Sequence, residues 1–208
     1  MDRESVLLIG AGGNAKVCID VIEQEGRFDV QGLIGYSHEV GSKVFDYPVI
    51  GTDEDLPSLL DDSVNVLIAV GQIKTPDPRI RLFDLAQKNG CRFPIIVSPQ
   101  AYVSKHAKLN AGTIVMHGAV INAGAEVGRN CIINSQSLIE HEVIIADHCH
   151  IATGATVNSG VHIGMGTFIG SNSSIRQCIN IGEKCVIGMG QRVLTDCETG
   201  IRMPSEIS

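Results

Sequence analysis

The sequence predicts a protein in two parts, a small parallel α/β sheet followed by a parallel β-helix. Strand-like and helix-like segments alternate in the first half, and a glycine-rich turn joins the first strand to the first helix. In the second half a branched aliphatic residue returns every six positions. The chain has 208 residues, of which 44% are hydrophobic, which is enough for one large domain or two small ones.

The second half is built on a six-residue repeat that runs from residue 97 to residue 198 without an insertion. Val, Ile or Leu leads every unit, and the fifth position is mostly small. A hexapeptide β-helix has this period: one unit forms a short strand and a corner, and three units close a coil. Residues 18 apart therefore stack on one face. Cys131, Cys149 and Cys185 fall in one such column, so we expect them to fill the core rather than to act as nucleophiles.

The first 96 residues have the pattern of a small Rossmann-like sheet. The expected strands are at residues 6–9, 30–34, 48–51 and 64–70. The expected helices are at residues 14–25, at residues 53–60 with Asp53 as the cap, and at residues 78–89. We therefore expect a nucleotide-binding α/β domain at residues 1–96, a β-helix at residues 97–198 and a tail at residues 199–208.

The turn after the first strand contains Gly10, Gly12 and Gly13 in a GxGxxA pattern. Such a turn presents backbone N–H groups and a helix N-terminus to a phosphate, and Lys16 adds a positive charge nearby. A dinucleotide site also needs an acidic residue after the second strand to hold the ribose, but residues 35–37 are Gly-Tyr-Ser. We therefore do not expect NAD. The turn either binds the phosphate of another nucleotide or only joins strand to helix.

The composition excludes several classes of function. A net charge of −7 and 4% aromatic residues argue against nucleic-acid binding, which needs basic groups and stacking side chains. No apolar run approaches ~20 residues, so we expect no membrane span. Seven cysteines without a CxxC pair, and no recognisable signal peptide, predict free thiols in a cytoplasmic protein.

Several motifs along the chain form a recognisable set: Gly10-Ala-Gly-Gly-Asn-Ala-Lys16, Ala69-Val-Gly71, Ile96-Val-Ser-Pro-Gln-Ala101, Asn134-Ser-Gln-Ser-Leu-Ile-Glu-His-Glu142 and His150-Ile-Ala-Thr-Gly-Ala155. With them the chain resembles the sugar O-acyltransferase family of the sialic acid O-acetyltransferase (NeuD) and UDP-4-amino-sugar N-acetyltransferase (PglD) type. Three features depart from that pattern. Asn14 stands where the family often has His, residues 35–36 lack an acidic pair, and the tail lacks the family's GxPA(R/K) close.

The resemblance implies a left-handed β-helix, a homotrimer and acetyl-CoA as co-substrate. It makes His141 the general base, with Glu142 beside it, and places His150 near the acetyl group of acetyl-CoA. It also makes the glycine turn the site of a nucleotide-linked amino sugar. A histidine suits this task because its near-neutral pKa lets it take the proton of an attacking amine. Neighbouring strand residues point to opposite faces, so Glu142 reaches His141 only if a corner bends the chain there, and Glu140 is a second candidate carboxylate.

Repeat positions add two candidates. Ser159 is 18 residues after His141, one coil above it, and we expect its backbone N–H to bind the thioester oxygen. Asn134 either fixes the amine or the ring of the base, or is an ordinary corner residue. His150 lies half a coil from His141, so we expect the active site between subunits of a cyclic trimer.

Three functions remain open at this stage. The preferred one is transfer of an acetyl group from acetyl-CoA to the amino group of a nucleotide-linked 4-amino-deoxy sugar, by direct attack. The alternatives are O-acetylation of sialic acid or a related sugar, and a non-catalytic trimeric scaffold that binds nucleotide sugar. No metal is expected. The γ-type carbonic anhydrases, which share this helix, use an H-x4-H zinc pair, and the nearest approach to it here is His148-Cys149-His150.

Overall fold

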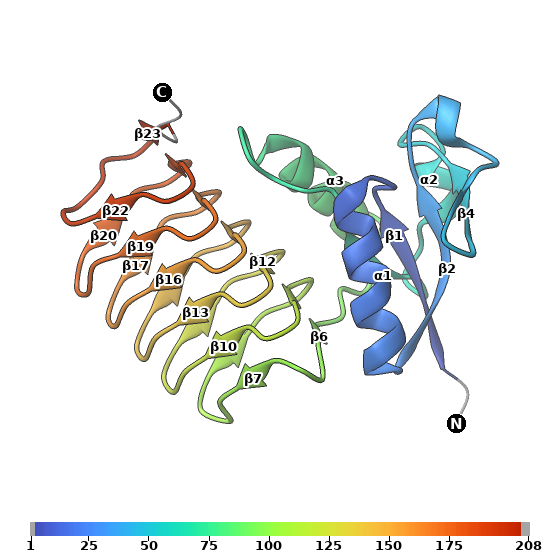
Figure 1. The fold of residues 1–208 in the computed structure, drawn as a ribbon. Helices are drawn as coiled ribbons and strands as arrows, with labels where there is room; N and C mark the ends of the chain where they lie inside the picture. The colour runs from blue at the N-terminus through green and yellow to red at the C-terminus, as the bar shows by residue number, and fades with distance from the viewer. Residues whose placement is uncertain (1–2, 205–208) are drawn as a thin grey trace.

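A computed structural model describes residues 3–204 (Figure 1). An α/β lobe and a β-helix lie side by side, with the lobe helix α3 (Asp77–Lys88) next to the β-helix (Figure 1). The fold class predicted from the sequence, a parallel α/β lobe followed by a left-handed β-helix, is confirmed. None of the helices in residues 3–204 combines the length and the apolarity that crossing a membrane requires.

The lobe is a five-stranded sheet with the strand order β3-β4-β2-β1-β5. All its strands are parallel except β3, which is antiparallel to β4. In chain order its elements are β1 (Glu4–Ile9), α1 (Gly13–Glu25), β2 (Phe28–Ile34), the 3-10 helix η1 (Ser37–Glu39), β3 (Lys43–Val44), β4 (Tyr47–Gly51), α2 (Leu56–Leu59), β5 (Asn65–Ile68) and α3 (Asp77–Lys88).

Helices cover both faces of this sheet, as the near-continuous apolar runs of its strands require. Val6 and Leu8 of β1 point into a core that they share with α1, whereas Leu7 and Ile9 point into a second core shared with α2 and α3. The chain passes from β2 and β4 to the far side of β1 before it forms β5. The order of the strands therefore reverses next to the turn that follows β1, where open α/β sheets bind their ligands.

The second lobe helix differs from its prediction. We expected Asp53 to cap a helix reaching Leu60, but α2 is one turn long, Leu56–Leu59. Asp53 instead pairs with Arg81 of α3, 2.5 Å away. The turn before α2 is held by Asp55, whose Oδ2 accepts hydrogen bonds from the N–H of Thr52 (2.8 Å) and from its hydroxyl (3.0 Å). The side chain that organises this turn therefore lies two residues later than the sequence suggested.

The β-helix is a stack of two-residue strands in three parallel sheets. The lobe-facing sheet contains β6 (Ile96–Val97), β9 (Ile114–Val115), β12 (Ile132–Ile133), β15 (His150–Ile151), β18 (Phe168–Ile169), β21 (Val186–Ile187) and β23 (Arg202–Met203). The second sheet contains β7 (Tyr102–Val103), β10 (Val120–Ile121), β13 (Leu138–Ile139), β16 (Thr156–Val157), β19 (Ser174–Ile175) and β22 (Arg192–Val193). The third contains β8 (Lys108–Leu109), β11 (Glu126–Val127), β14 (Ile144–Ile145), β17 (His162–Ile163) and β20 (Asn180–Ile181).

The predicted stacking of residues 18 apart is confirmed: Ile151 pairs with Ile169, for example, and Ile139 with Val157. The leading residues of the units from Val115 to Val193 are all buried in one core. Only the leaders of the first coil are partly exposed, because no coil lies beneath them: Val97, Val103 and Leu109. Burial of these branched side chains supplies the main favourable term for the fold, roughly 1.5–3 kcal/mol for each fully buried Val, Ile or Leu.

The last coil is shorter than the others. Cys197 bridges to Ile181 and Arg202 pairs with Val186, a spacing of 16 residues instead of 18. The strand β23 falls in the stretch that we expected to be a tail, residues 199–208, and it continues the lobe-facing sheet. Residues 205–208 of that stretch lie outside the described residues.

The lobe packs on the β-helix through α1. Ile114, Met116 and Ile132 share a buried cluster with Cys18 and Ile22 of α1. The lobe therefore covers one of the three sheets, and it leaves the corner between the other two on the opposite side of the triangular cross-section.

Candidate functional site

The corner between the second and third sheets carries His141. We call it the outer corner: residues 140–142, between β13 and β14, together with their equivalents in other coils. The fourth residue of each six-residue unit from Gly112 to Gly190 has a positive φ, and at this corner that residue is Glu142, with φ 60°. The left-handed residue bends the chain. The bend that the sequence argument required between His141 and Glu142 is therefore present.

Both nitrogens of the His141 ring have polar neighbours. Nδ1 lies 3.7 Å from Oε2 of Glu142, and Nε2 lies 2.8 Å from Oγ of Ser159, one coil above. A proton on Nδ1 faces the carboxylate, which leaves the Nε2 lone pair to accept a hydrogen bond from the Ser159 hydroxyl. The His141 side chain is 58% exposed, so a small molecule has open access to it. Chemically, this is an imidazole oriented by a carboxylate and able to take a proton at Nε2.

Glu140 and Ser159 also lie near this corner and make different contacts. Glu140 does not reach the His141 ring, because its Oε2 accepts hydrogen bonds from Asn122 Nδ2 (3.1 Å) and from the backbone N–H of His141 (3.3 Å). The backbone N–H of Ser159 has no hydrogen-bond partner within residues 3–204. Its predicted role as a donor to the thioester oxygen stays a prediction, and its hydroxyl adds the contact to Nε2 that sequence reasoning missed.

His150 lies on the lobe-facing sheet, in strand β15, and is only 7% exposed. Its Nδ1–H donates to the backbone oxygen of Gln72 in the lobe, at 2.7 Å, and its Nε2 accepts from Nδ2 of Asn134 at 3.2 Å. Burial lowers the pKa of His150 to about 4, so the ring is neutral at physiological pH. Within the described residues Asn134 contacts His150, a contact that sequence reasoning missed, and its predicted role of fixing the amine or the ring of the base stays a prediction. The predicted contact of His150 with an acetyl group stays a prediction.

The structure therefore separates the two predicted histidines. His141 lies at the outer corner and His150 on the opposite, lobe-facing side, half a coil away. One protomer does not bring them together, in agreement with the argument from the repeat.

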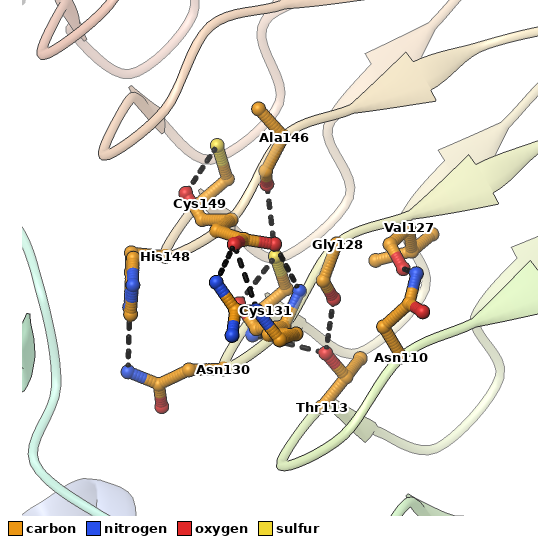
Figure 2. A network of polar contacts seen from close by, with 11 residues as sticks. Asn110, Thr113, Val127, Gly128, Asn130, Cys131, Ala146, His148 and Cys149 are labelled. Atoms are coloured by element: carbon orange, nitrogen blue, oxygen red, sulfur yellow. Dashed lines mark hydrogen bonds and ion pairs between the residues drawn. The ribbon is translucent and has the colours of Figure 1, made fainter. Parts of the chain in front are cut away.

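The cysteines of the repeat lie inside the β-helix. Cys131, Cys149 and Cys185 are fully buried, and their Sγ atoms donate to backbone oxygens, as Figure 2 shows for Cys131 with Ala146. Burial raises the pKa of the Cys149 thiol well above its ordinary value, which disfavours the thiolate that a nucleophile needs. Cys178 is the exposed one of the seven cysteines, and it lies at the outer corner one coil above Gly160.

The turn after β1 contains one glycine with no room for a side chain and two glycines that face open space. Gly10 has φ 123°, and a Cβ there would lie 2.7 Å from the backbone nitrogen of Val70, so only glycine fits. Gly12 and Gly13 face open space at the N-terminus of the 13-residue helix α1, and Gly12 is its N-cap with no side-chain bond to the helix. Unpaired N–H groups and the helix dipole make this end suitable for an anion.

Two further residues define the surroundings of this turn. Lys16, in the first turn of α1, lines a groove of about 450 Å³ together with Asp20 and Phe45. Asn14, where the resembling family often has histidine, donates from Nδ2 to the backbone oxygen of Ala69 at 3.0 Å and so ties the turn to the end of β5. Asn14 therefore has a structural function that its place in the motif did not reveal.

Sequence reasoning missed Arg79, a guanidinium that is 1% exposed and joins the lobe to the β-helix. It donates to the backbone oxygens of Ile68 (2.7 Å) and Val70 (2.6 Å) and to both oxygens of Asn130 (2.8 and 2.7 Å). Asn130 in turn contacts Nδ1 of His148 at 2.9 Å (Figure 2). Burial lowers the pKa of Arg79 to about 10, so it stays charged at neutral pH. No pattern in the sequence distinguishes it from Arg81, the other arginine of α3.

One other arrangement resembles a functional site. Ser98 Oγ lies 2.7 Å from Nδ1 of His117, whose Nε2 lies 2.8 Å from Asp20, but Ser98 is 1% exposed and its hydroxyl has no access to a substrate. This chain of contacts links α1 to the first coils. Within residues 3–204 no group of three or more His, Cys, Asp and Glu side chains has the arrangement of a metal site.

Comparison with known proteins links the two parts to known families. Residues 5–83 match the PglD N-terminal domain and residues 160–194 match the hexapeptide repeat of succinyl-transferase. These matches confirm the predicted resemblance to PglD-type hexapeptide-repeat acyltransferases.

Solved structures with the same overall arrangement agree. A histidine-to-asparagine mutant of perosamine N-acetyltransferase from Caulobacter crescentus, in complex with CoA and GDP-perosamine, is 27% identical, with a TM-score of 0.89 over 97% of this chain and 93% of that one. The acetyltransferase domain of PglB from Neisseria gonorrhoeae, in complex with acetyl coenzyme A, is 26% identical, with a TM-score of 0.88 over 98% of this chain and 97% of that one. WeeI from Acinetobacter baumannii, at 22% identity and a TM-score of 0.83, covers 97% of each chain and shares the fold.

Proposed function

We propose that this protein transfers an acetyl group from acetyl-CoA to the amino group of a nucleotide-linked 4-amino-deoxy sugar. The observation that carries the proposal is the exposed His141 ring, with a carboxylate 3.7 Å from Nδ1 and only a serine hydroxyl at Nε2. Two similar structures support it, since one holds CoA with GDP-perosamine and the other holds acetyl coenzyme A. Two of the perosamine enzyme structures carry a substitution of a histidine.

In the proposed reaction the sugar nitrogen attacks the thioester carbon directly. Nε2 of His141 takes the proton that the nitrogen loses, and Glu142 stabilises the charged ring. The tetrahedral intermediate then collapses, the C–S bond breaks, and the proton passes to the sulfur to give CoA and the N-acetyl sugar. The backbone N–H of Ser159 is a candidate donor to the developing oxyanion. No protein thiol takes part, which agrees with the burial of the cysteine column.

We also propose that the site forms between protomers of a homotrimer. The glycine turn of the lobe and His141 lie on opposite sides of the lobe-facing sheet in one chain. A sugar bound by its nucleotide at that turn therefore needs the outer corner of a neighbouring copy. In a cyclic trimer each copy gives its corner to one neighbour and its lobe to the other, so all three sites are equivalent.

The direct test measures release of the CoA thiol from acetyl-CoA with UDP-, GDP- or dTDP-linked 4-amino sugars. The proposal expects turnover with at least one of them and an N-acetyl product in the mass spectrum. Turnover with sialic acid instead would identify the O-acetyltransferase alternative. Binding of a nucleotide sugar without thiol release would identify the non-catalytic scaffold, and either result contradicts the proposal.

The proposed role of the lobe, binding the nucleotide phosphate, can be tested at Gly12. Its φ of −79° is ordinary for an N-cap, and a side chain there meets open space, so Gly12→Asp and Gly12→Asn both fit. Both caps are expected to stabilise α1 by a few tenths of a kcal/mol. Only the aspartate repels a phosphate, so we expect it to raise the KM for the nucleotide sugar at least ~10-fold above that of the asparagine variant. Equal KM values would place the nucleotide elsewhere.

A further inference from the structure

An exposed aromatic pair lies beside the glycine turn. Tyr36 is 75% exposed, and its ring lies parallel to that of His38, with an interplanar angle of 7° and a centroid distance of 5.8 Å. The two residues follow β2 at the carboxyl end of the sheet, the edge at which α1 also begins (Figure 1). The chain has only three tyrosines and no tryptophan, and Tyr36 is the most exposed of the large hydrophobic side chains in residues 3–204.

The loop that carries Tyr36 is in contact with the glycine turn. The N–H of Gly10 donates to the backbone oxygen of Ile34 at 2.8 Å. A Cβ built on Gly35 would lie 3.1 Å from the Cβ of Ala11. A ligand with a phosphate at the start of α1 therefore extends readily along the loop at residues 35–39.

The one carboxylate of this loop holds the loop itself. Oε2 of Glu39 accepts the backbone N–H of Tyr36 at 2.8 Å, and the N–H of Glu39 donates to the backbone oxygen of Tyr36 at 2.8 Å. The same oxygen lies 2.7 Å from where a Cβ on Gly35 would be, so a larger residue at position 35 would displace it. The usual arrangement, an acid after the second strand that binds the ribose, is replaced here by an acid that fixes the backbone under an aromatic ring.

We propose that Tyr36, with His38 packed against it, is the stacking platform for the nucleobase, an inference that rests on the proposed nucleotide-sugar substrate. A ring held on a rigid loop loses little entropy when a base stacks on it. Stacking uses the π-face that every base presents, so the platform accepts different bases. A purine covers more of the ring than a pyrimidine does, so guanosine nucleotides bind more tightly than uridine nucleotides.

The test measures the dissociation constants of GDP and UDP by calorimetry on the full chain. We expect Tyr36→Ala to weaken GDP at least ~10-fold, because loss of one stacked base contact has this effect. The preference for GDP over UDP disappears in that variant. Tyr36→Phe keeps the ring and stays within about twofold of the wild type. Tyr102→Ala, which removes another exposed tyrosine from the first coil, is the matched control and leaves both constants unchanged.

The outcomes separate this inference from the proposed function. If the wild type acetylates a nucleotide sugar and Tyr36→Ala binds GDP as tightly as the wild type, the platform is wrong and the function stands. Tyr36-dependent nucleotide binding without any acetyl transfer supports the platform and contradicts the enzyme. If the wild type binds neither nucleotide, the platform is wrong, and the turnover assay with UDP-, GDP- and dTDP-linked sugars decides the function separately.

Discussion

The outer corner and the lobe-facing sheet of the β-helix each carry a histidine of the same repeat, nine residues apart, and use it differently. His141 at the corner is exposed, with a carboxylate at one nitrogen and a serine hydroxyl at the other. His150 on the sheet is buried, and both of its nitrogens are bound, one of them by a backbone oxygen of the lobe. The comparison teaches that position in the coil, rather than residue type, decides which imidazole is free to exchange protons.

The polar groups around the two histidines reinforce this difference. The lobe-facing side includes the buried Arg79 and its bonds to Asn130, which fix the lobe on the β-helix. At the outer corner the side chains of Glu140 and His141 contact neighbours within the repeat, Asn122 and Ser159. The lobe-facing side thus has a fixed geometry, whereas the outer corner leaves the His141 ring accessible to a small molecule.

The largest expected effect is at the outer corner. His141→Ala removes the proposed base and should lower kcat ~10²–10⁴-fold without altering the fold, because the side chain is exposed. The matched control is His106→Ala, which removes an exposed histidine two coils lower at the same corner. Steady-state kinetics and circular dichroism decide the matter, and a loss below threefold would remove His141 from the role.

The second largest effect is expected on the lobe-facing side, where His150 should make the free energy of unfolding depend on pH. Burial lowers the pKa of His150 from 6.5 to about 4, so between these values the unfolded chain binds a proton that the folded protein does not. The free energy of unfolding should therefore fall as the pH drops from about 6.5 toward 4, by up to about 3 kcal/mol from this residue. Burial also lowers the pKa of His148, which acts in the same direction.

Replacement of the buried ring isolates its share of this pH dependence. His150→Gln can still donate to Gln72 and accept from Asn134 but does not titrate, so its unfolding free energy should change less over this pH range than that of the wild type. His162→Gln, at an exposed position of the third sheet, should keep the wild-type slope. Denaturant titrations at several pH values measure the slopes, and equal slopes for all three proteins would show that His150 is not buried as described.

The smallest effect is expected at Glu142. Its carboxylate is 78% exposed and 3.7 Å from Nδ1, so water and salt screen much of its influence on the ring. Glu142→Gln should lower kcat by less than about tenfold, with the loss becoming smaller as salt is added. Glu140→Gln serves as a comparison, since Glu140 contacts Asn122 rather than the ring. A loss as large as that of His141→Ala would make Glu142 an essential catalytic group.

The repeat made most of the β-helix predictable, because few folds other than a β-helix bury a branched residue at every sixth position. The helix cap at Asp53 and the stretch after residue 198 were less well predicted, since both depend on tertiary contacts. Asp53 pairs with Arg81 instead of capping a helix, and β23 joins the lobe-facing sheet after a coil shortened to 16 residues.

For the candidate site, the stacking rule correctly placed Ser159 above His141 and kept His150 on another face. It did not pair Asn134 with His150, because these residues lie in successive coils but at different points of the unit, and only the side-chain geometry joins them. Arg79 and the Gln72 contact were not predictable at all, since both cross between parts of the chain with unrelated sequence patterns.

The central claim, that one copy supplies the base and another the nucleotide site, is tested most directly by mixing two variants that are each impaired in a different half of the site. His141→Ala lacks the base and Gly12→Asp is impaired in the nucleotide site, and each alone should show little activity at low nucleotide-sugar concentration. In assemblies formed from equal amounts of both, a site shared between copies combines an intact corner with an intact lobe in about a quarter of cases. We therefore predict recovery of about a quarter of the wild-type activity, whereas mixed assemblies that remain inactive would contradict the claim.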